Sequence, residues 1–345
     1  MPPLRRDVRE LIDPKKHPFH RHATVELFVA RRGGHVAGRI AAVHNDRHDK
    51  YHADGAGFFG LFECEHDPLV ATALFDVAAK WLASRGMTTM RGPASFSLNE
   101  EAGLLVDGFD GPPVVMMTYN PAWYAELIEA NGFTKSMDLL AYRLRNPEPG
   151  DRLVRMGDKL RRRYNVTVRT LNMKRFPKEV ALIRHVYNEA WEDNWGHIPM
   201  TEAELDYMAN QLKPVVNPRL VVFAEVNGEL AGFGLALPDL NVPLKQMGGS
   251  LFPVGWIKAL WYSRRITMAR AVTLGVLKPY RRSGVSELMV IELMKNARAA
   301  GIVDSEFSWI LETNRLMRTQ LEKLGATVYR TYRLYDKPIS MTAGG

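Results

Sequence analysis

The sequence predicts an α/β protein with α+β mixed sheets, made of two copies of one fold in tandem. An apolar strand, Ala271 to Leu277, runs through a basic turn into a long apolar helix, Glu287 to Ala300. In addition, three short patterns of the first half return in the same order in the second half. A chain of 345 residues is long enough for two domains, each with its own core.

The recurring patterns are a hairpin and the segments that close each copy. Phe28 to Gly38 matches Val222 to Gly232, and both segments turn at glycines as β-hairpins do. Asn120 and Asn314 stand at matching places in the two copies, and Tyr142-Arg143-Leu144 returns as Tyr332-Arg333-Leu334. We therefore expect domains at 1–145 and 179–339, a basic linker at 146–178 and a flexible tail at 340–345.

The turn after the apolar strand has the chemistry of a phosphate-binding loop. A helix start exposes unpaired backbone N–H groups, a glycine lets backbone approach an anion, and arginines add fixed charge. The alternative is an ordinary strand–turn–helix corner with surface arginines. The candidate binding residues are Val276, Arg281, Arg282, Ser283, Gly284, Val285 and Ser286.

The spacing Arg281-x-x-Gly284-x-Ser286 resembles the acyl-CoA loop of the GNAT acyltransferase superfamily. The order that follows is similar too: a strand, Asn314, a short helix and a closing strand after Gly325. The resemblance implies a GNAT-type N-acyltransferase that uses acyl-CoA as co-substrate and no metal. It also implies that an amine attacks the thioester directly and that backbone N–H near Val276 polarises the thioester carbonyl.

Two catalytic roles then need side chains. Glu312, which follows the strand after the loop, is the candidate base, with Asn314 beside it and Glu192 or Asp193 as alternatives. Leu321 stands where many GNAT proteins carry the tyrosine that protonates the leaving thiolate. The nearest substitutes are Tyr280, Tyr262 and Tyr332.

The first copy differs where the phosphate loop would lie. Its strand Gly57 to Phe62 leads into Glu63, Glu65 and Asp67 instead of arginines. Carboxylates repel a pyrophosphate, so we expect no CoA there and expect this copy to wall the acceptor cleft.

The linker is strongly basic, and Leu153, Met156, Leu160 and Tyr164 recur in it at helical spacing. It is either a connecting helix with solvated charges or a helix that attaches to anionic lipid. Nucleic-acid binding is a weaker alternative, because no DNA- or RNA-binding motif accompanies the charge.

The composition sets outer limits on the function. The net charge of +8 favours anionic partners such as CoA phosphates or anionic lipid. One cysteine, Cys64, excludes an intramolecular disulfide, and the histidines between His17 and His52 meet no strict metal-ligand spacing. The sequence shows no signal peptide and no membrane-spanning run, so we expect a cytoplasmic protein, or one peripheral on the inner membrane face.

The resemblance can be narrowed to the bacterial GNAT-like family that includes the bacterial ceramide synthases. It rests on the tandem arrangement, on Phe58 to Glu63, on Arg91-Gly92-Pro93 and on Ser308 to Asn314. It implies transfer of a long-chain acyl group to the amine of a sphingoid base, as in sphingolipid biosynthesis. The alternatives are an N-acyltransferase for a small amine or amino acid and a non-catalytic CoA- or lipid-binding protein.

Overall fold

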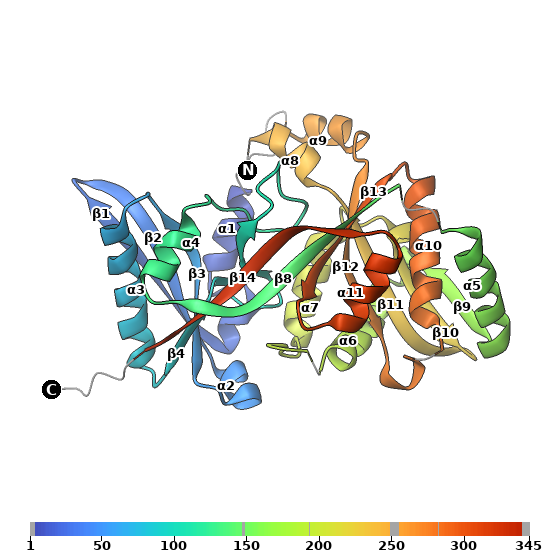
Figure 1. Ribbon diagram of the computed structural model, residues 1–345, viewed down its shortest axis with the longest axis horizontal. Helices are drawn as coiled ribbons and strands as arrows, with labels where there is room; N and C mark the ends of the chain where they lie inside the picture. The colour runs from blue at the N-terminus through green and yellow to red at the C-terminus, as the bar shows by residue number, and fades with distance from the viewer. Residues whose placement is uncertain (1–3, 147–148, 193, 249–254, 282, 340–345) are drawn as a thin grey trace. The chain divides into compact units, whose positions relative to one another are not determined.

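The computed structural model describes residues 4–146, 149–192, 194–248, 255–281 and 283–339 (Figure 1). The predicted tail at 340–345 lies outside these residues. Contacts divide the chain into an N-terminal unit and a C-terminal unit. The N-terminal unit comprises Asp13–Ala141, Ile310–Arg315 and Val328–Gly345, and the C-terminal unit comprises Met1–Ile12, Tyr142–Trp309 and Leu316–Thr327.

This division differs from the boundaries expected from sequence at both ends of the chain. Helix α1 (Arg5–Ile12) belongs to the C-terminal unit, where Glu10 accepts hydrogen bonds from Gln211 (3.0 Å) and Tyr207 (3.4 Å). Nearly all of β14 (Thr327–Pro338) belongs to the N-terminal unit. Each copy therefore takes one element from the far end of the chain.

The C-terminal unit is built on a mixed sheet in the order β9-β10-β11-β12-β13. Neighbours are antiparallel except β12 and β13, which are parallel. The strands are β9 (Val166–Thr170), β10 (Val221–Val226), β11 (Glu229–Pro238), β12 (Met268–Val276) and β13 (Asp304–Leu311). The helices after α1 are α5 (Asp151–Tyr164), α6 (Phe176–Ala190), α7 (Glu202–Leu212), α8 (Asn241–Met247), α9 (Gly255–Ser263), α10 (Val285–Ala299) and α11 (Arg315–Lys323), with 3₁₀ turns η2 (Met173–Arg175), η3 (Pro218–Leu220) and η4 (Lys278–Tyr280).

Helices cover both faces of this sheet because its strands are apolar on both sides. On β10, Phe223 lies in the cluster formed with α6 and α7, whereas Val222 and Ala224 lie in the cluster formed with α10. Adjacent residues of a strand point to opposite faces, so this alternation seats α6 and α10 on different sides. Among the described residues, no helix is both long and apolar enough to cross a bilayer.

The N-terminal unit repeats this plan in the order β1-β2-β3-β4-β14-β8, with β3 and β4 parallel. Its strands are β1 (Ala23–Arg32), β2 (His35–Asn45), β3 (Ala56–Cys64), β4 (Thr89–Gly92), β7 (Leu104–Asp107) and β8 (Thr134–Arg145). Only the part of β8 up to Ala141 belongs to this unit. A separate two-stranded ribbon is formed by β5 (Ala94–Ser95) and β6 (Glu101–Ala102). Its helices are α2 (Asp46–His52), α3 (Pro68–Ala83) and α4 (Tyr124–Ala130), with a 3₁₀ turn η1 (Pro18–Arg21).

The strand register supports the internal repeat. The β1/β2 hairpin shifts register between Ala30 and Arg31, and the β10/β11 hairpin shifts between Ala224 and Glu225. These are the positions that the sequence alignment of the two hairpins places together. A bulge at matching positions twists both hairpins in the same way.

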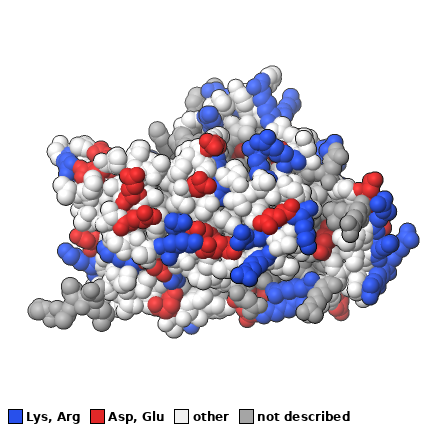
Figure 2. All heavy atoms as spheres, viewed as in Figure 1, with Lys and Arg blue, Asp and Glu red and all other residues white. Residues whose placement is uncertain are grey.

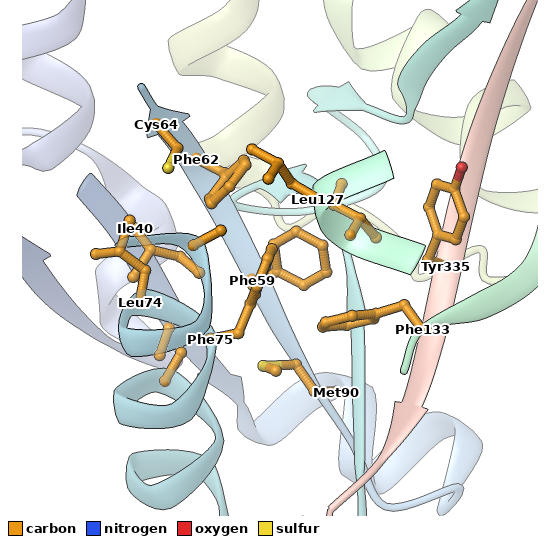
Figure 3. Close-up of a cluster of buried hydrophobic side chains, with 14 of the residues drawn as sticks. Ile40, Phe59, Phe62, Cys64, Leu74, Phe75, Met90, Leu127, Phe133 and Tyr335 are labelled. Carbon is orange, nitrogen blue, oxygen red and sulfur yellow. The ribbon is translucent and has the colours of Figure 1, made fainter. Parts of the chain in front are cut away.

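The core of the N-terminal unit is aromatic and includes a residue from β14 (Figure 3). Phe75 of α3 stacks on Phe62 with ring centroids 4.8 Å apart, and meets Phe133 at 4.9 Å. Tyr335 of β14 is 1% exposed in the same cluster, and β14 pairs with β4 from Tyr335 to Pro338. This unit therefore buries its full core only with β14 in place.

The basic linker is part of the C-terminal unit. Helix α5 packs on α10, where an added Cβ at Gly157 would lie 2.9 Å from Ile291. Leu160 and Tyr164 join the cluster beneath α10, and Arg161 pairs with Glu292 at 3.2 Å. Leu160 and Tyr164 of the predicted apolar stripe thus pack on the protein, whereas Met156 is 40% exposed. The exposed basic residues described on this helix are Arg155, Lys159, Arg162 and Arg163.

Arg330 provides a test of how β14 stabilises the N-terminal unit. Its side chain is 1% exposed and donates to the carbonyls of Gly108, Asp110, Gly111 and Pro112 at 2.9–3.2 Å. Arg330→Met should lower the free energy of unfolding by about 3 kcal/mol or more, because buried carbonyls lose their donor. Urea denaturation measures the change. Arg31→Met, at an exposed site of the same unit, is the control and should change stability by less than about 0.5 kcal/mol.

Candidate active site

The predicted phosphate loop is a strand–turn–helix junction in the C-terminal unit. Strand β12 ends at Val276, η4 follows, and Gly284 precedes α10 with φ of 76°. No described side chain caps the start of this helix. The first N–H groups of a helix have no intrahelical partner, so they remain available to an anion.

Gly284 is required at this position for two reasons. Its positive φ is unfavourable for residues with a side chain. In addition, a Cβ there would overlap the side chain of Leu160 on α5. The linker helix therefore packs directly against the turn that starts α10.

The other predicted loop residues have separate roles. Val285 is 1% exposed and packs in the core, and the Ser283 hydroxyl donates to the Tyr280 carbonyl at 2.6 Å. The Ser286 hydroxyl donates to Glu287 at 2.8 Å. Arg281 donates to the carbonyls of Ala190 (3.0 Å) and Val276 (3.4 Å), which ties the turn to the end of α6. Arg282 lies outside the described residues.

Beside this loop, β12 and β13 separate. They pair from Met268 with Asp304 to Ala271 with Phe307, and then β12 continues to Val276 while β13 continues to Leu311. Past the last pair, backbone groups of the two strands no longer bond each other. We call this opening the strand splay.

A buried charged cluster spans the base of the strand splay. Arg270 and Glu306 are register partners, 3% and 0% exposed. Arg270 crosses from β12 to donate to the Ser308 hydroxyl (2.9 Å) and carbonyl (3.2 Å), and that hydroxyl donates to Glu306 at 2.6 Å. The cluster thus links the strands where their backbone pairing stops.

Two polar atoms farther along the splay are buried. Thr273 Oγ1 on β12 and Trp309 Nε1 on β13 have no hydrogen-bond partner among the described residues. Both residues lie past the last paired position. Buried polar groups are normally satisfied, so these two are candidates to contact a bound molecule.

An aromatic wall lies next to the end of β12. Trp191 covers Gly275, where a Cβ would overlap its ring, and it stacks on Tyr187 with centroids 4.9 Å apart. Burial raises the pKa of Tyr187 to about 12. His197 is buried with its ring 5.8 Å from that of Tyr187. Gly275 is therefore the position that lets Trp191 approach the strand.

The candidates Glu192 and Tyr280 border the same loop. Glu192 is exposed and pairs with Lys278 at 2.9 Å, and Asp193 lies outside the described residues. Tyr280 donates to Glu229 at 2.9 Å. Because Glu229 accepts that hydrogen bond, the pKa of Tyr280 is raised.

Glu312 and Asn314 belong to the N-terminal unit, whereas the loop belongs to the C-terminal unit. Glu312 accepts from Lys135 Nζ at 2.7 Å and from the Asp138 backbone N–H at 3.0 Å. The Asn314 backbone N–H donates to the Leu311 carbonyl at 2.9 Å, just before α11. Glu312 is thus held as a carboxylate acceptor by two donors.

In the first copy, the position that corresponds to the phosphate loop is occupied by protein groups. Asp67 caps α3, with its side chain accepting from the N–H of Leu69 (2.9 Å) and Val70 (3.4 Å), and it pairs with Arg32. Glu63 accepts from Tyr124 at 2.8 Å, and Glu65 pairs with His35 at 3.3 Å. The start of α3 therefore carries its own carboxylate.

The splay of the first copy is also filled. The Leu61 N–H donates to Ser95 of β5 at 3.2 Å, and the Cys64 N–H donates to the Tyr124 hydroxyl at 2.9 Å. A Cβ at Gly60 would overlap the carbonyl of Ala94. The backbone donors beyond the β3/β4 pairing are therefore already bonded within the N-terminal unit.

Two further features lie apart from this arrangement. A cavity of about 320 Å³ lies at the other end of β11, next to Pro238, and none of the predicted site residues lines it. Among the described residues, no group of three side chains could hold a metal ion. In the histidine-rich segment, His44 and His48 instead pair with Asp49 (2.6 Å) and Asp54 (2.8 Å).

Comparison with known proteins places the chain among its relatives. No family model matches it. It is 39% identical over 349 residues to a protein named bacterial ceramide synthase from Caulobacter vibrioides (strain NA1000 / CB15N), a match that covers 98% of this chain and 90% of that protein. The chain belongs to the family of this bacterial ceramide synthase. It is also 37% identical to protein YghO of Escherichia coli K12, over 98% of this chain and 88% of that one.

Solved structures agree on the fold. A tandem GNAT protein from the clavulanic acid biosynthesis pathway superposes with a TM-score of 0.54 at 14% identity, covering 94% of this chain and 85% of that one. A GCN5-related N-acetyltransferase from Sphaerobacter thermophilus gives 0.52 at 14% identity, over 91% and 81%. The predicted tandem GNAT-like fold and family are confirmed, and with them the expectation of an acyltransferase enzyme.

Sequence reasoning missed the buried cluster of Arg270, Glu306 and Ser308. A signal was present, because an arginine and a glutamate each interrupt an apolar strand. Charged residues are almost never fully buried unless paired, so two such interruptions in parallel neighbours predict a pair.

The cluster can be tested by a double-mutant cycle. Arg270→Leu or Glu306→Leu alone should destabilise the protein by about 3–5 kcal/mol, because each leaves a buried charge without its partner, and the double variant should cost less than the sum. Urea denaturation measures all four proteins. Strict additivity would contradict the role of the pair. The exposed pair Lys278 and Glu192 is the control, with a coupling of about 1 kcal/mol or less.

Proposed function

We propose that this protein is an acyl-CoA-dependent N-acyltransferase that transfers a long-chain acyl group to the amine of a sphingoid base. The observation that carries the CoA proposal is the difference between the two copies. Helix α10 starts at a glycine with no described side-chain cap, whereas α3 starts at Asp67, which caps it. One CoA per chain follows, with its pyrophosphate at the start of α10.

The acceptor and chain length rest on the family. The relative at 39% identity is named bacterial ceramide synthase, and this chain covers 90% of its length. A long-chain donor and a lipid amine suit a cytoplasmic protein that contacts the inner face of the membrane from one side.

In the proposed reaction, the amine nitrogen attacks the thioester carbonyl carbon, the C–S bond breaks, and the CoA thiolate leaves. The pyrophosphate binds the first N–H groups of α10, near Gly284 and Ser286. Backbone N–H near Val276, at the strand splay, stabilises the oxyanion. Thr273 and Trp309 offer further donors in the same splay. The N-terminal copy binds no CoA in this proposal.

The attacking amine must lose its proton, and Glu312 is the proposed base with Asn314 beside it. Lys135 Nζ and the Asp138 backbone N–H both donate to its carboxylate, which fixes the orientation of the side chain. Glu192 is the alternative base, on the same unit as the loop. Tyr280 is the proposed acid, although a thiolate can also leave to water.

The function is tested by incubating purified protein with a long-chain acyl-CoA and a sphingoid base, and by mass spectrometry of the lipid products. Lipid extracts from cells with and without the protein provide the matching experiment in vivo. Transfer only from short acyl-CoA to a small amine would replace the lipid acceptor with the alternative substrate class. Absence of any transfer, with CoA bound, would leave a CoA-binding protein.

The CoA site predicts that Ser286→Asp and Arg281→Glu each weaken CoA binding at least tenfold. Each places a negative charge at the start of α10, where it repels the pyrophosphate. Asp67 places such a charge at the start of α3 in the first copy. Calorimetry measures affinity and stoichiometry. Ser286→Asn is the neutral control of similar shape and should bind normally. Glu63→Gln with Glu65→Gln should leave the stoichiometry at one, and an unchanged affinity in both charged variants would refute the site.

The base predicts that Glu312→Gln lowers turnover by a factor on the order of a hundred at neutral pH, with CoA affinity unchanged. The rate of the variant should recover as pH rises, because the acceptor amine then deprotonates without help. Lys135→Met, which breaks the same ion pair and keeps the carboxylate, is the control. Full activity of Glu312→Gln at neutral pH would transfer the role to Glu192.

A further inference from the structure

The surface of α9 is the feature that the site does not use. Trp256, Ile257, Leu260 and Trp261 are 52–64% exposed, and their spacing of i, i+1, i+4 and i+5 places them on one face of the helix. The opposite face, with Gly255, Ala259 and Tyr262, is more buried. Helix α9 thus presents its largest apolar residues to the outside.

Such a cluster is costly in water. Burying one side chain of this size stabilises by about 1.5–3 kcal/mol relative to exposure. Single exposed apolar residues are ordinary on protein surfaces, but contiguous groups mark a surface that binds a partner or a membrane. Two of the four are tryptophans, which are enriched at the interface between water and bilayer.

The charged residues on α9 and in the segments that flank it along the chain are all basic. The segment from Leu240 to Ser286 contains no aspartate or glutamate. Lys245 on α8, Lys258 on α9, and Arg264 and Arg265 after it are exposed. Figure 2 shows Lys and Arg atoms over α8 and α9 at the top of the view. An apolar face with these cations beside it is complementary to a bilayer with anionic headgroups.

Helix α5 lacks this combination. Its basic residues are exposed, but Leu160, Tyr164 and Gly157 face α10 and the core. An interfacial helix needs an apolar face free for the lipid as well as positive charge. Among the described residues, α5 exposes one large apolar side chain, Met156 (40%), whereas α9 exposes four.

We propose that α9 is the membrane-docking helix of this protein, with its four apolar side chains inserted among the lipids and the neighbouring cations on anionic headgroups. Docking would give the proposed lipid acceptor a route from the bilayer to the enzyme. This use of the docking surface rests on the proposed function. The surface itself is argued from exposure and charge alone.

The test uses the full chain and vesicles of phosphatidylcholine with 0% or about 30% phosphatidylglycerol, sedimented at low salt. Wild type should sediment with the anionic vesicles only, and binding should fall as salt rises. Trp256→Gln with Trp261→Gln should weaken partitioning at least tenfold. Lys258→Gln, Arg264→Gln and Arg265→Gln together should weaken it on the order of a hundredfold.

The matched control changes the same number of charges on α5, with Arg155→Gln, Arg162→Gln and Arg163→Gln. Its affinity for vesicles should lie within about threefold of wild type, once the smaller net charge of the variant is taken into account. Loss of binding in the α5 variant, with both α9 variants unaffected, would overturn the proposal. So would a wild-type chain that does not bind anionic vesicles at low salt.

A second measurement separates lipid from protein partners. Tryptophan fluorescence should be quenched by brominated lipid in wild type, and less in the double tryptophan variant. Sedimentation velocity without vesicles should show the same mass for both proteins. Self-association that the tryptophan changes abolish would instead assign this face to a second copy of the chain.

Failure of docking and failure of the proposed function give different results. The α9 variants should retain acyl transfer to a short, soluble amine from a soluble acyl-CoA, because α9 carries no site residue. Vesicle binding without transfer to any amine would remove the proposed function and leave the docking surface. Transfer without vesicle binding would do the reverse.

Discussion

The structure of the C-terminal unit depends on the place where β12 and β13 stop pairing. Four residue pairs hold the strands parallel, and beyond Ala271 and Phe307 the sheet opens. An opening in the middle of a sheet exposes backbone donors that would otherwise be bonded. Arg270 stabilises this opening because it donates hydrogen bonds to Ser308 on the other strand, so a side chain links the strands where their backbone pairing ends. The predicted phosphate loop lies at the end of the same strand, β12.

The two copies share one fold but differ at the start of one helix. Both have the same hairpin bulge, the same parallel strand pair and a helix between the two strands of that pair. In the first copy, a carboxylate caps the helix and side chains bond the free strand donors. These polar groups of the first copy are thus satisfied internally, whereas α10 of the second copy starts without a described side-chain cap.

Much of the fold and of the candidate site could be predicted from the sequence, because these features depend on short local patterns. The repeat, the turn at Gly284 and the acidic substitution at Asp67 each depend on neighbouring residues. The assignment of β14 and α1 to the opposite units could not be predicted in this way, since strand pairing between distant segments leaves no local signal. The same applies to Glu312, whose partners Lys135 and Asp138 stand far away in the sequence. Its role remains a prediction.

The place of β14 has a consequence for how the protein is made. Proteins are synthesised from the N-terminus, and domains generally fold as units while the chain emerges. The N-terminal unit cannot do so here, because Tyr335 and Arg330 complete its core and its sheet. The edge of β4 must wait unpaired while nearly all of the second copy is translated. An exposed strand edge can pair with other chains, so β4 is open to such pairing until β14 has been translated.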